Sequence, residues 1–184
     1  MKRAKGAFEI ALAALACAVA TAALTLGAYV NFMFVTGYLI AIFALMVPLS
    51  KKLFWGDMLA FVGAAILSSL FGMGAFGFLK ILPFVCFFGL HPLINALQRT
   101  HVRKKVLHAL IFLIKAAWFD LTLLVCFFVL VPLFGLDGMR WYPYFERYLY
   151  LIVFAGGTVF FALYDYLIFL CQRSVDLIVK RIGR

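Results

Sequence analysis

The stretch Val106–Phe134 reads VLHALIFLIKAAWFDLTLLVCFFVLVPLF and is apolar almost throughout, but it carries Lys115 and Asp120 in its interior. A helix rises about 1.5 Å per residue, so this stretch is long enough to cross a hydrocarbon core of about 30 Å. A lone charge at that depth costs on the order of 2.5–3.5 kcal/mol, so both side chains should face protein and have partners. The stretch therefore predicts a membrane helix that is surrounded by others.

The composition of the whole chain agrees with this prediction. The 184 residues are 67% hydrophobic and 13% charged, whereas soluble domains are about 25% charged. The apolar runs lack the alternation of barrel strands, so helices are expected to satisfy the backbone in lipid. We expect a single integral membrane domain over residues 1–184, an all-α bundle in a cell membrane, with a bacterial membrane favoured.

The apolar runs predict six spans, at about 7–30, 31–49, 58–79, 81–98, 106–134 and 148–172. The first run is longer than a signal-peptide core, so it is expected to be retained. Asp57 is expected to cap the third span at its start. Pro83 and Pro92 predict a kink near Gly89 in the fourth span.

The basic residues give the expected orientation. The net charge is +10, but the basic residues form short clusters between apolar runs, which indicates topology determinants and not a nucleic-acid surface. Of the 17 Lys and Arg residues, all but Lys80, Lys115, Arg140 and Arg147 fall on one side of six spans. The positive-inside rule then places both termini in the cytoplasm.

Five polar residues are expected to form a buried network within the later spans. Lys115, Asp165 and His91 lie at similar depths, Asn95 lies one turn from His91, and Asp120 lies deeper. Lys115 can pair with Asp165. The network is interpreted either as a structural device that fixes helix packing or as a relay for protons or substrate.

The loop 136–147 is the most polar and aromatic segment between spans. One interpretation is an interfacial aromatic belt with arginines that reach toward water. The other is a lid over a site for a small anionic or ring-containing solute, since arginine binds carboxylates through two parallel hydrogen bonds. The candidate substrate-binding residues are Lys80, Arg140, Trp141, Tyr142, Tyr144 and Arg147.

The motifs of catalysis are missing from the sequence. It has no phosphate-binding Gly-rich loop with Lys, no metal-spaced His pair and no Ser/His/Asp set at plausible depths. The four cysteines lie in apolar spans without paired spacing, which favours a role as small apolar residues. We expect no enzyme activity, no metal and no cofactor.

Small residues recur four apart in the first and third spans, at Ala14, Ala18 and Ala22 and at Ala60 and Ala64. With six short spans and both ends in the cytoplasm, the chain resembles the substrate-binding S component of energy-coupling factor (ECF) transporters. The stretch 87–97, FFGLHPLINAL, also resembles uncharacterised firmicute membrane proteins that are often grouped with S components.

The resemblance implies a vitamin-like solute and protein partners. In that family an alanine-rich face of the first helix docks onto a shared coupling subunit, and a pair of ATPases supplies the energy. The matching docking positions here are Ala14, Ala18 and Ala22, with Ala60 and Ala64 as a second candidate face. An alternative of similar size and helix count is a scaffold like the rod-shape protein MreD, which binds no solute.

Overall fold

The computed structural model describes residues 2–72, 75–102, 104–133, 135 and 138–182, and the regular elements within them are all helical. The chain forms two compact units. The first comprises Met1–His101 and Ile168–Arg184, and the second comprises Val102–Leu167. Each unit is described by itself.

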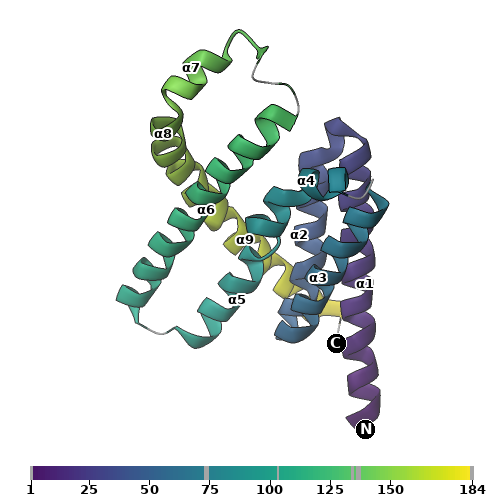
Figure 1. The fold of residues 1–184 in the computed structure, drawn as a ribbon. Coiled ribbons are helices and arrows are strands. Elements are labelled where there is room, and N and C mark those ends of the chain that lie inside the picture. The colour runs from purple at the N-terminus through teal and green to yellow at the C-terminus, as the bar shows by residue number, and fades with distance from the viewer. Residues whose placement is uncertain (1, 73–74, 103, 134, 136–137, 183–184) are drawn as a thin grey trace. The chain divides into compact units, whose positions relative to one another are not determined.

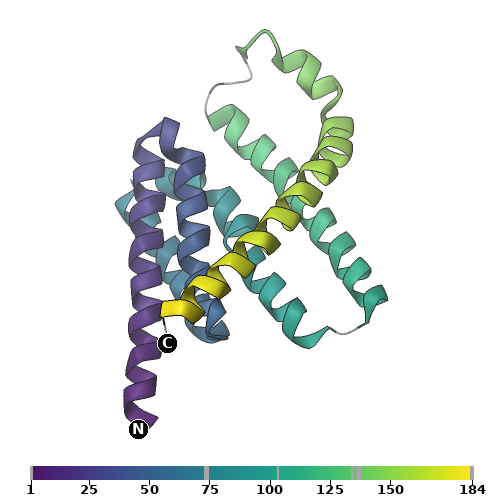
Figure 2. The same cartoon turned by 180° about the vertical axis from the view of Figure 1, so that it is seen from behind.

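The first unit is built on three packed helices: α1 (Lys2–Tyr29), α2 (Phe34–Ser50) and α3 (Phe54–Phe71) (Figures 1 and 2). Small residues let their backbones approach. A Cβ added at Gly37 of α2 would lie 2.5 Å from the carbonyl oxygen of Ala23 in α1. Only a glycine therefore permits this crossing, and small residues are what helix contacts in lipid use.

The turn between α2 and α3 closes α2 with a Schellman motif. The Leu53 N–H donates to the Pro48 carbonyl at 3.1 Å, and the Lys52 N–H donates to the Leu49 carbonyl at 2.9 Å. Lys52 has φ of 60°, the left-handed conformation that usually falls to glycine at this position. The backbone of this turn is thus fixed by hydrogen bonds at both ends.

The third helix differs from the expected span. It begins at Phe54 and ends at Phe71, and the next helix, α4, covers Ala75–Pro83. A Cβ at Gly77 would collide with the Gly72 backbone, so the chain turns back on itself within the expected span 58–79. Asp57 is not the cap that the sequence predicted, because Leu53 precedes the first helical residue and Asp57 lies buried in the first turn.

The expected irregularity near Gly89 is present. A π-helical turn, Phe84–Phe88, follows α4, and α5 begins at His91 and ends at His101. A Cβ at Gly89 would lie 2.5 Å from the Phe61 ring and 2.8 Å from the Phe84 ring. The bend therefore sets Gly89 against two core aromatic rings, where no larger residue has room.

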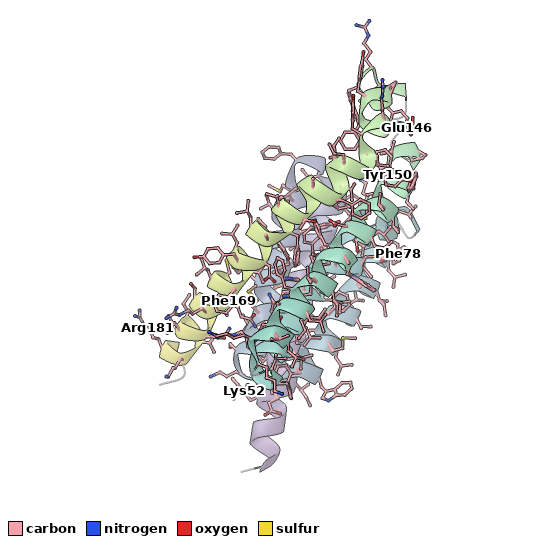
Figure 3. The ribbon with its side chains drawn as sticks, turned by 90° about the vertical axis from the view of Figure 1, so that its left-hand side faces the viewer. Lys52, Phe78, Glu146, Tyr150, Phe169 and Arg181 are labelled. Atoms are coloured by element: carbon pink, nitrogen blue, oxygen red, sulfur yellow. The ribbon has the colours of Figure 1, made fainter. Side chains whose placement is uncertain are left out.

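The second unit is organised around α6 (Lys105–Leu133). It continues through α7 (Tyr142–Arg147), α8 (Leu149–Leu151), a π-helical stretch at Ile152–Gly157 and the start of α9 (Thr158–Ile182). Its core is aromatic: the Phe161 ring lies 5.2 Å from that of Phe112 and 5.7 Å from that of Phe119. Glu146 on α7 and Tyr150 on α8 carry exposed side chains (Figure 3). The last span was expected to end at 172, but α9 continues to Ile182.

The described residues contain five helices that are long and apolar enough to cross a membrane, and α2 is a shorter apolar helix of 17 residues. Large apolar side chains such as Ile10, Leu113 and Leu163 are exposed on these helices. Lipid is the solvent that suits such surfaces. By helix length and hydropathy, the chain is a multi-pass membrane protein.

Candidate functional site

A buried ion pair joins α6 and α9 within the second unit. The Lys115 ammonium donates to Asp165 Oδ1 at 2.7 Å, and the two side chains are 6% and 23% exposed. Each charge would be costly in lipid without a partner. The pair therefore holds the two helices in one register, as the similar depths of these residues in the sequence suggested.

Asp120 lies farther along α6 and contacts the π-helical stretch before α9. The Thr158 hydroxyl is 3.1 Å from Asp120 Oδ2 and 2.7 Å from the Phe154 carbonyl oxygen. A Cβ on Gly157 would lie 2.7 Å from Asp120 Oδ1. The glycine thus leaves room for the carboxylate against the backbone, a contact that the sequence did not predict. The Gly156-Gly157 pair, at the depth of Asp120, is the feature of the sequence that could have indicated this contact.

His91 and Asn95 are buried in α5, which belongs to the first unit. The His91 ring lies 5.1 Å from the Phe87 ring, so it packs among aromatic side chains. Lys115, Asp120 and Asp165 belong to the second unit. His91 and Asn95 thus belong to one unit and the three charged residues to the other, and a network of all five stays a prediction.

The candidate substrate-binding residues also divide between the units. Lys80 lies in the first unit, where its ammonium donates to the Ala28 carbonyl at 2.6 Å and its own carbonyl accepts from the Tyr38 hydroxyl at 2.6 Å. Lysine at that place satisfies a carbonyl near the end of α1. Lys80 is therefore engaged in holding α1, α2 and α4 together.

The other candidates lie on or beside α7 in the second unit. Tyr142 stacks on Phe127 of α6, with the ring centroids 6.1 Å apart and the planes 3° from parallel. The Trp141 indole N–H lies 3.1 Å from the Met139 sulfur. Four of the candidates in this segment are exposed: Arg140, Trp141, Tyr144 and Arg147. The stacked rings of Tyr142 and Phe127 form an aromatic platform, and the same segment carries exposed arginines and the exposed Glu146. Residues 136–137 of the expected lid lie outside the described residues.

The two candidate docking faces have different surroundings. Ala14, Ala18 and Ala22 are all exposed on α1. In contrast, Ala60 and Ala64 are 2% and 0% exposed, because α3 uses them in packing inside the protein. The second docking face expected from the sequence is thus already covered by the chain itself.

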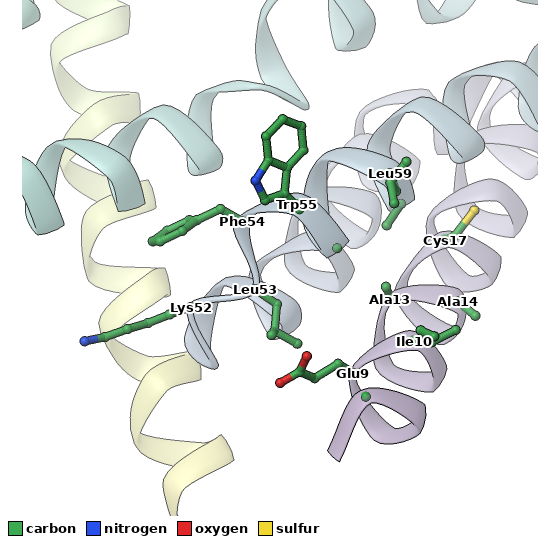
Figure 4. Close-up of a pocket in the computed structure, with 13 residues that line it drawn as sticks. Glu9, Ile10, Ala13, Ala14, Cys17, Lys52, Leu53, Phe54, Trp55 and Leu59 are labelled. Carbon is green, nitrogen blue, oxygen red and sulfur yellow. The ribbon is translucent and has the colours of Figure 1, made fainter. Parts of the chain in front are cut away.

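A groove of about 710 Å³ lies beside the exposed stripe, between α1 and the start of α3 (Figure 4). Its lining combines small residues, among them Ala13, Ala14 and Gly56, with large ones such as Trp55 and Leu59. Glu9 stands at its edge beside Leu53. The small residues let another helix backbone approach closely. Ala14 belongs to both the groove and the exposed stripe, so the two adjoin at this residue.

Elsewhere in the first unit, Arg99 of α5 meets Asp176 of α9 at 3.5 Å, with its guanidinium 5.2 Å from the Phe169 ring. No three His, Cys, Asp or Glu side chains of the described residues are placed to hold a metal ion. What the molecule offers is thus buried polar contacts, an aromatic platform and an open small-residue surface. Comparison with protein-family models, curated proteins and solved structures finds no match to this chain.

Proposed function

We propose that this membrane protein is a non-catalytic subunit that docks through the α1 stripe of Ala14, Ala18 and Ala22 onto a helix of a second membrane protein. The observation that carries the proposal is that α1 has small residues on two faces, only one of which is buried. The face that includes Ala16 and Ala20 is buried. The α1 stripe, which is also made of alanines, is exposed. Helix association in lipid relies on close backbone approach at such residues.

The geometry inside the first unit supports this role for the stripe. The contact between α1 and α2 already depends on a small residue, Ala23, facing Gly37. A second helix can pack on the opposite side of α1 by the same means. The groove that Ala14 shares with Gly56 widens this surface toward the start of α3.

We further propose that the complex is an importer of ECF type, in which this chain captures a vitamin-like solute. The partners are then a coupling subunit and a pair of ATPases, since the proposal gives this chain no catalytic role. The segment that supports solute capture is the one with the aromatic platform, where Arg140 and Arg147 are also exposed. Arginine and aromatic faces suit an anionic or ring-containing solute.

The test of docking is co-purification from the native membrane. Ala18→Leu adds bulk to the exposed stripe, and Ala117→Leu makes the same change at an exposed position of α6. We expect Ala18→Leu to remove co-purifying membrane proteins while Ala117→Leu retains them. Equal recovery of partners with both variants would contradict the proposal.

A second candidate function is a membrane scaffold that binds no solute, like MreD. The pair of Lys115 with Asp165 favours it, because these buried charges are engaged with each other. A ligand that binds only the folded state raises the unfolding midpoint. A vitamin panel that shifts the midpoint of the purified protein would support solute capture, and a panel without effect would favour the scaffold.

A further inference from the structure

A polar pocket lies at the end of the first unit where α2 turns into α3. Its volume is about 370 Å³, and α5 and the final turns of α9 complete its walls. Leu49, Leu93 and Ala96 form a small apolar cluster with Phe54 packed against it, and all of these but Leu93 line the pocket. The pocket is thus lined by both apolar and polar residues, and Lys52 and Phe54 also line the groove beside α1.

The charged groups of the pocket leave one net positive charge. Lys52, Arg99 and Asp176 line it. Arg99 and Asp176 lie 3.5 Å apart, with side chains 38% and 37% exposed. The Lys52 side chain reaches from the turn toward α9 and away from Glu9 (Figure 4). A ligand with a single negative charge matches this balance better than a neutral or doubly charged one.

The uncharged walls offer hydrogen-bond acceptors. Gln172 is 3% exposed, and its Oε1 accepts no hydrogen bond from the described residues. The Ser50 hydroxyl donates to the Val47 carbonyl at 2.7 Å, and the Thr100 hydroxyl donates to the Ala96 carbonyl at 2.8 Å. These hydroxyl protons are thus engaged, and their oxygen lone pairs remain as acceptors. The pocket calls for a ligand that brings donors as well as an anion.

Lys52 has an unusual backbone conformation at the edge of this pocket. Among the described residues, Lys52 is the non-glycine residue with positive φ. Strained backbone of this kind is concentrated at functional positions. A lysine at a position suited to glycine strains the backbone, but it places a cation at the pocket.

We propose that this pocket binds the headgroup of an anionic glycerophospholipid, a phosphodiester that carries free hydroxyl groups. The phosphate binds Lys52 and the exposed edge of Arg99. The lipid hydroxyls donate hydrogen bonds to Gln172 Oε1 and to the hydroxyl oxygens of Ser50 and Thr100. The acyl chains leave along the apolar surface of the helices. Basic pockets between membrane helices are known to hold such headgroups. The proposal is independent of the docking function.

The test measures lipid retained by the purified full chain in native mass spectrometry after reconstitution in phosphatidylcholine with a second lipid. The second lipid is phosphatidylglycerol, or phosphatidic acid, which has the phosphate without free hydroxyls. We expect phosphatidylglycerol to be retained in preference to both other lipids. Equal retention of phosphatidic acid and phosphatidylglycerol would overturn the assignment of the hydroxyl groups.

Two variants locate the site. Lys52→Gln is expected to weaken retention about tenfold, the effect of losing one charge-assisted contact. Lys51→Gln removes the same charge from the adjacent exposed residue, which does not line the pocket, and is expected to retain lipid like the wild type. Equal loss in both variants would overturn the site. Lys52→Gly also removes the charge while it relieves the backbone, so loss of lipid there cannot come from misfolding.

A last experiment distinguishes a lipid phosphate from a soluble phosphate as the ligand. Glycerol 3-phosphate or inorganic phosphate is added to protein in phosphatidylcholine alone. We expect neither to protect the protein against thermal unfolding at concentrations where phosphatidylglycerol does. Equal protection by a soluble phosphate that is lost in Lys52→Gln but not in Lys51→Gln would overturn the lipid in favour of a free phosphate ligand.

Discussion

Gly157 lies so close to Asp120 that a methyl group in place of its hydrogen would stand 2.7 Å from the carboxylate Oδ1. The two residues come from different helical segments of the second unit, and Asp120 is 4% exposed. The carboxylate is also within 3.1 Å of the Thr158 hydroxyl. The packing of the π-helical stretch against α6 therefore depends on the absence of a side chain at 157.

The first prediction concerns this contact. Gly157→Ala should lower the free energy of unfolding by about 1–3 kcal/mol, because the added carbon overpacks a buried carboxylate. Gly156→Ala is the matched control, since a Cβ there meets no atom within 4 Å. Thermal unfolding in detergent should show a lower midpoint for Gly157→Ala alone. Asp120→Ala combined with Gly157→Ala should recover part of the loss, and equal behaviour of the two glycine variants would refute the contact.

The second prediction concerns the pair of Lys115 and Asp165. Lys115→Met removes the cation that pairs with the Asp165 carboxylate, which should lower the free energy of unfolding by about 3 kcal/mol. Adding Asp165→Leu should restore most of this loss, because no unmatched charge then remains. Lys105→Met, at the exposed start of α6, should change stability by less than about 0.5 kcal/mol. A double-mutant cycle with no coupling energy would show that the pair does not hold α6 to α9.

The third prediction concerns the crossing of α1 and α2. Gly37→Ala places a carbon 2.5 Å from the Ala23 carbonyl oxygen, and a backbone atom cannot move aside as a side chain can. We expect a loss of about 1–3 kcal/mol in the free energy of unfolding. Gly6→Ala, where a Cβ meets nothing within 4 Å, should be neutral or slightly stabilising. An unchanged unfolding midpoint for Gly37→Ala would mean that the helices do not approach as closely as described.

Hydropathy and the depth of charged residues predicted several features of the fold from the sequence. The all-helical class, the long helix around Lys115 and the bend near Gly89 come from apolar run length and from proline placement. The pairing of Lys115 with Asp165 was predicted from the cost of burying each charge alone. These features depend on local composition, which a single sequence displays.

Features set by helix contacts were not predictable in the same way. The sequence predicts a third span that continues to 79, because the residues on both sides of Gly72 are equally apolar. The end of α3 at Phe71 depends instead on how α3 and α4 meet. Asp57 has the residue type of a cap, but its burial is decided by the helices around it. The covered state of Ala60, in contrast to the exposed Ala18, likewise depends on which face of each helix is used.

The sequence predicts that the chain crosses the membrane six times, with α2 as the second crossing, and the rest of the account depends on this topology. At about 1.5 Å per residue its 17 residues are slightly short of a typical hydrocarbon core. The direct test uses Phe32→Cys and Lys51→Cys, one at each end of α2, in a chain without its four native cysteines. A membrane-impermeant maleimide should label Phe32→Cys from outside intact cells and Lys51→Cys only after the membrane is opened. Labelling of both positions from the same side would contradict the six-crossing arrangement.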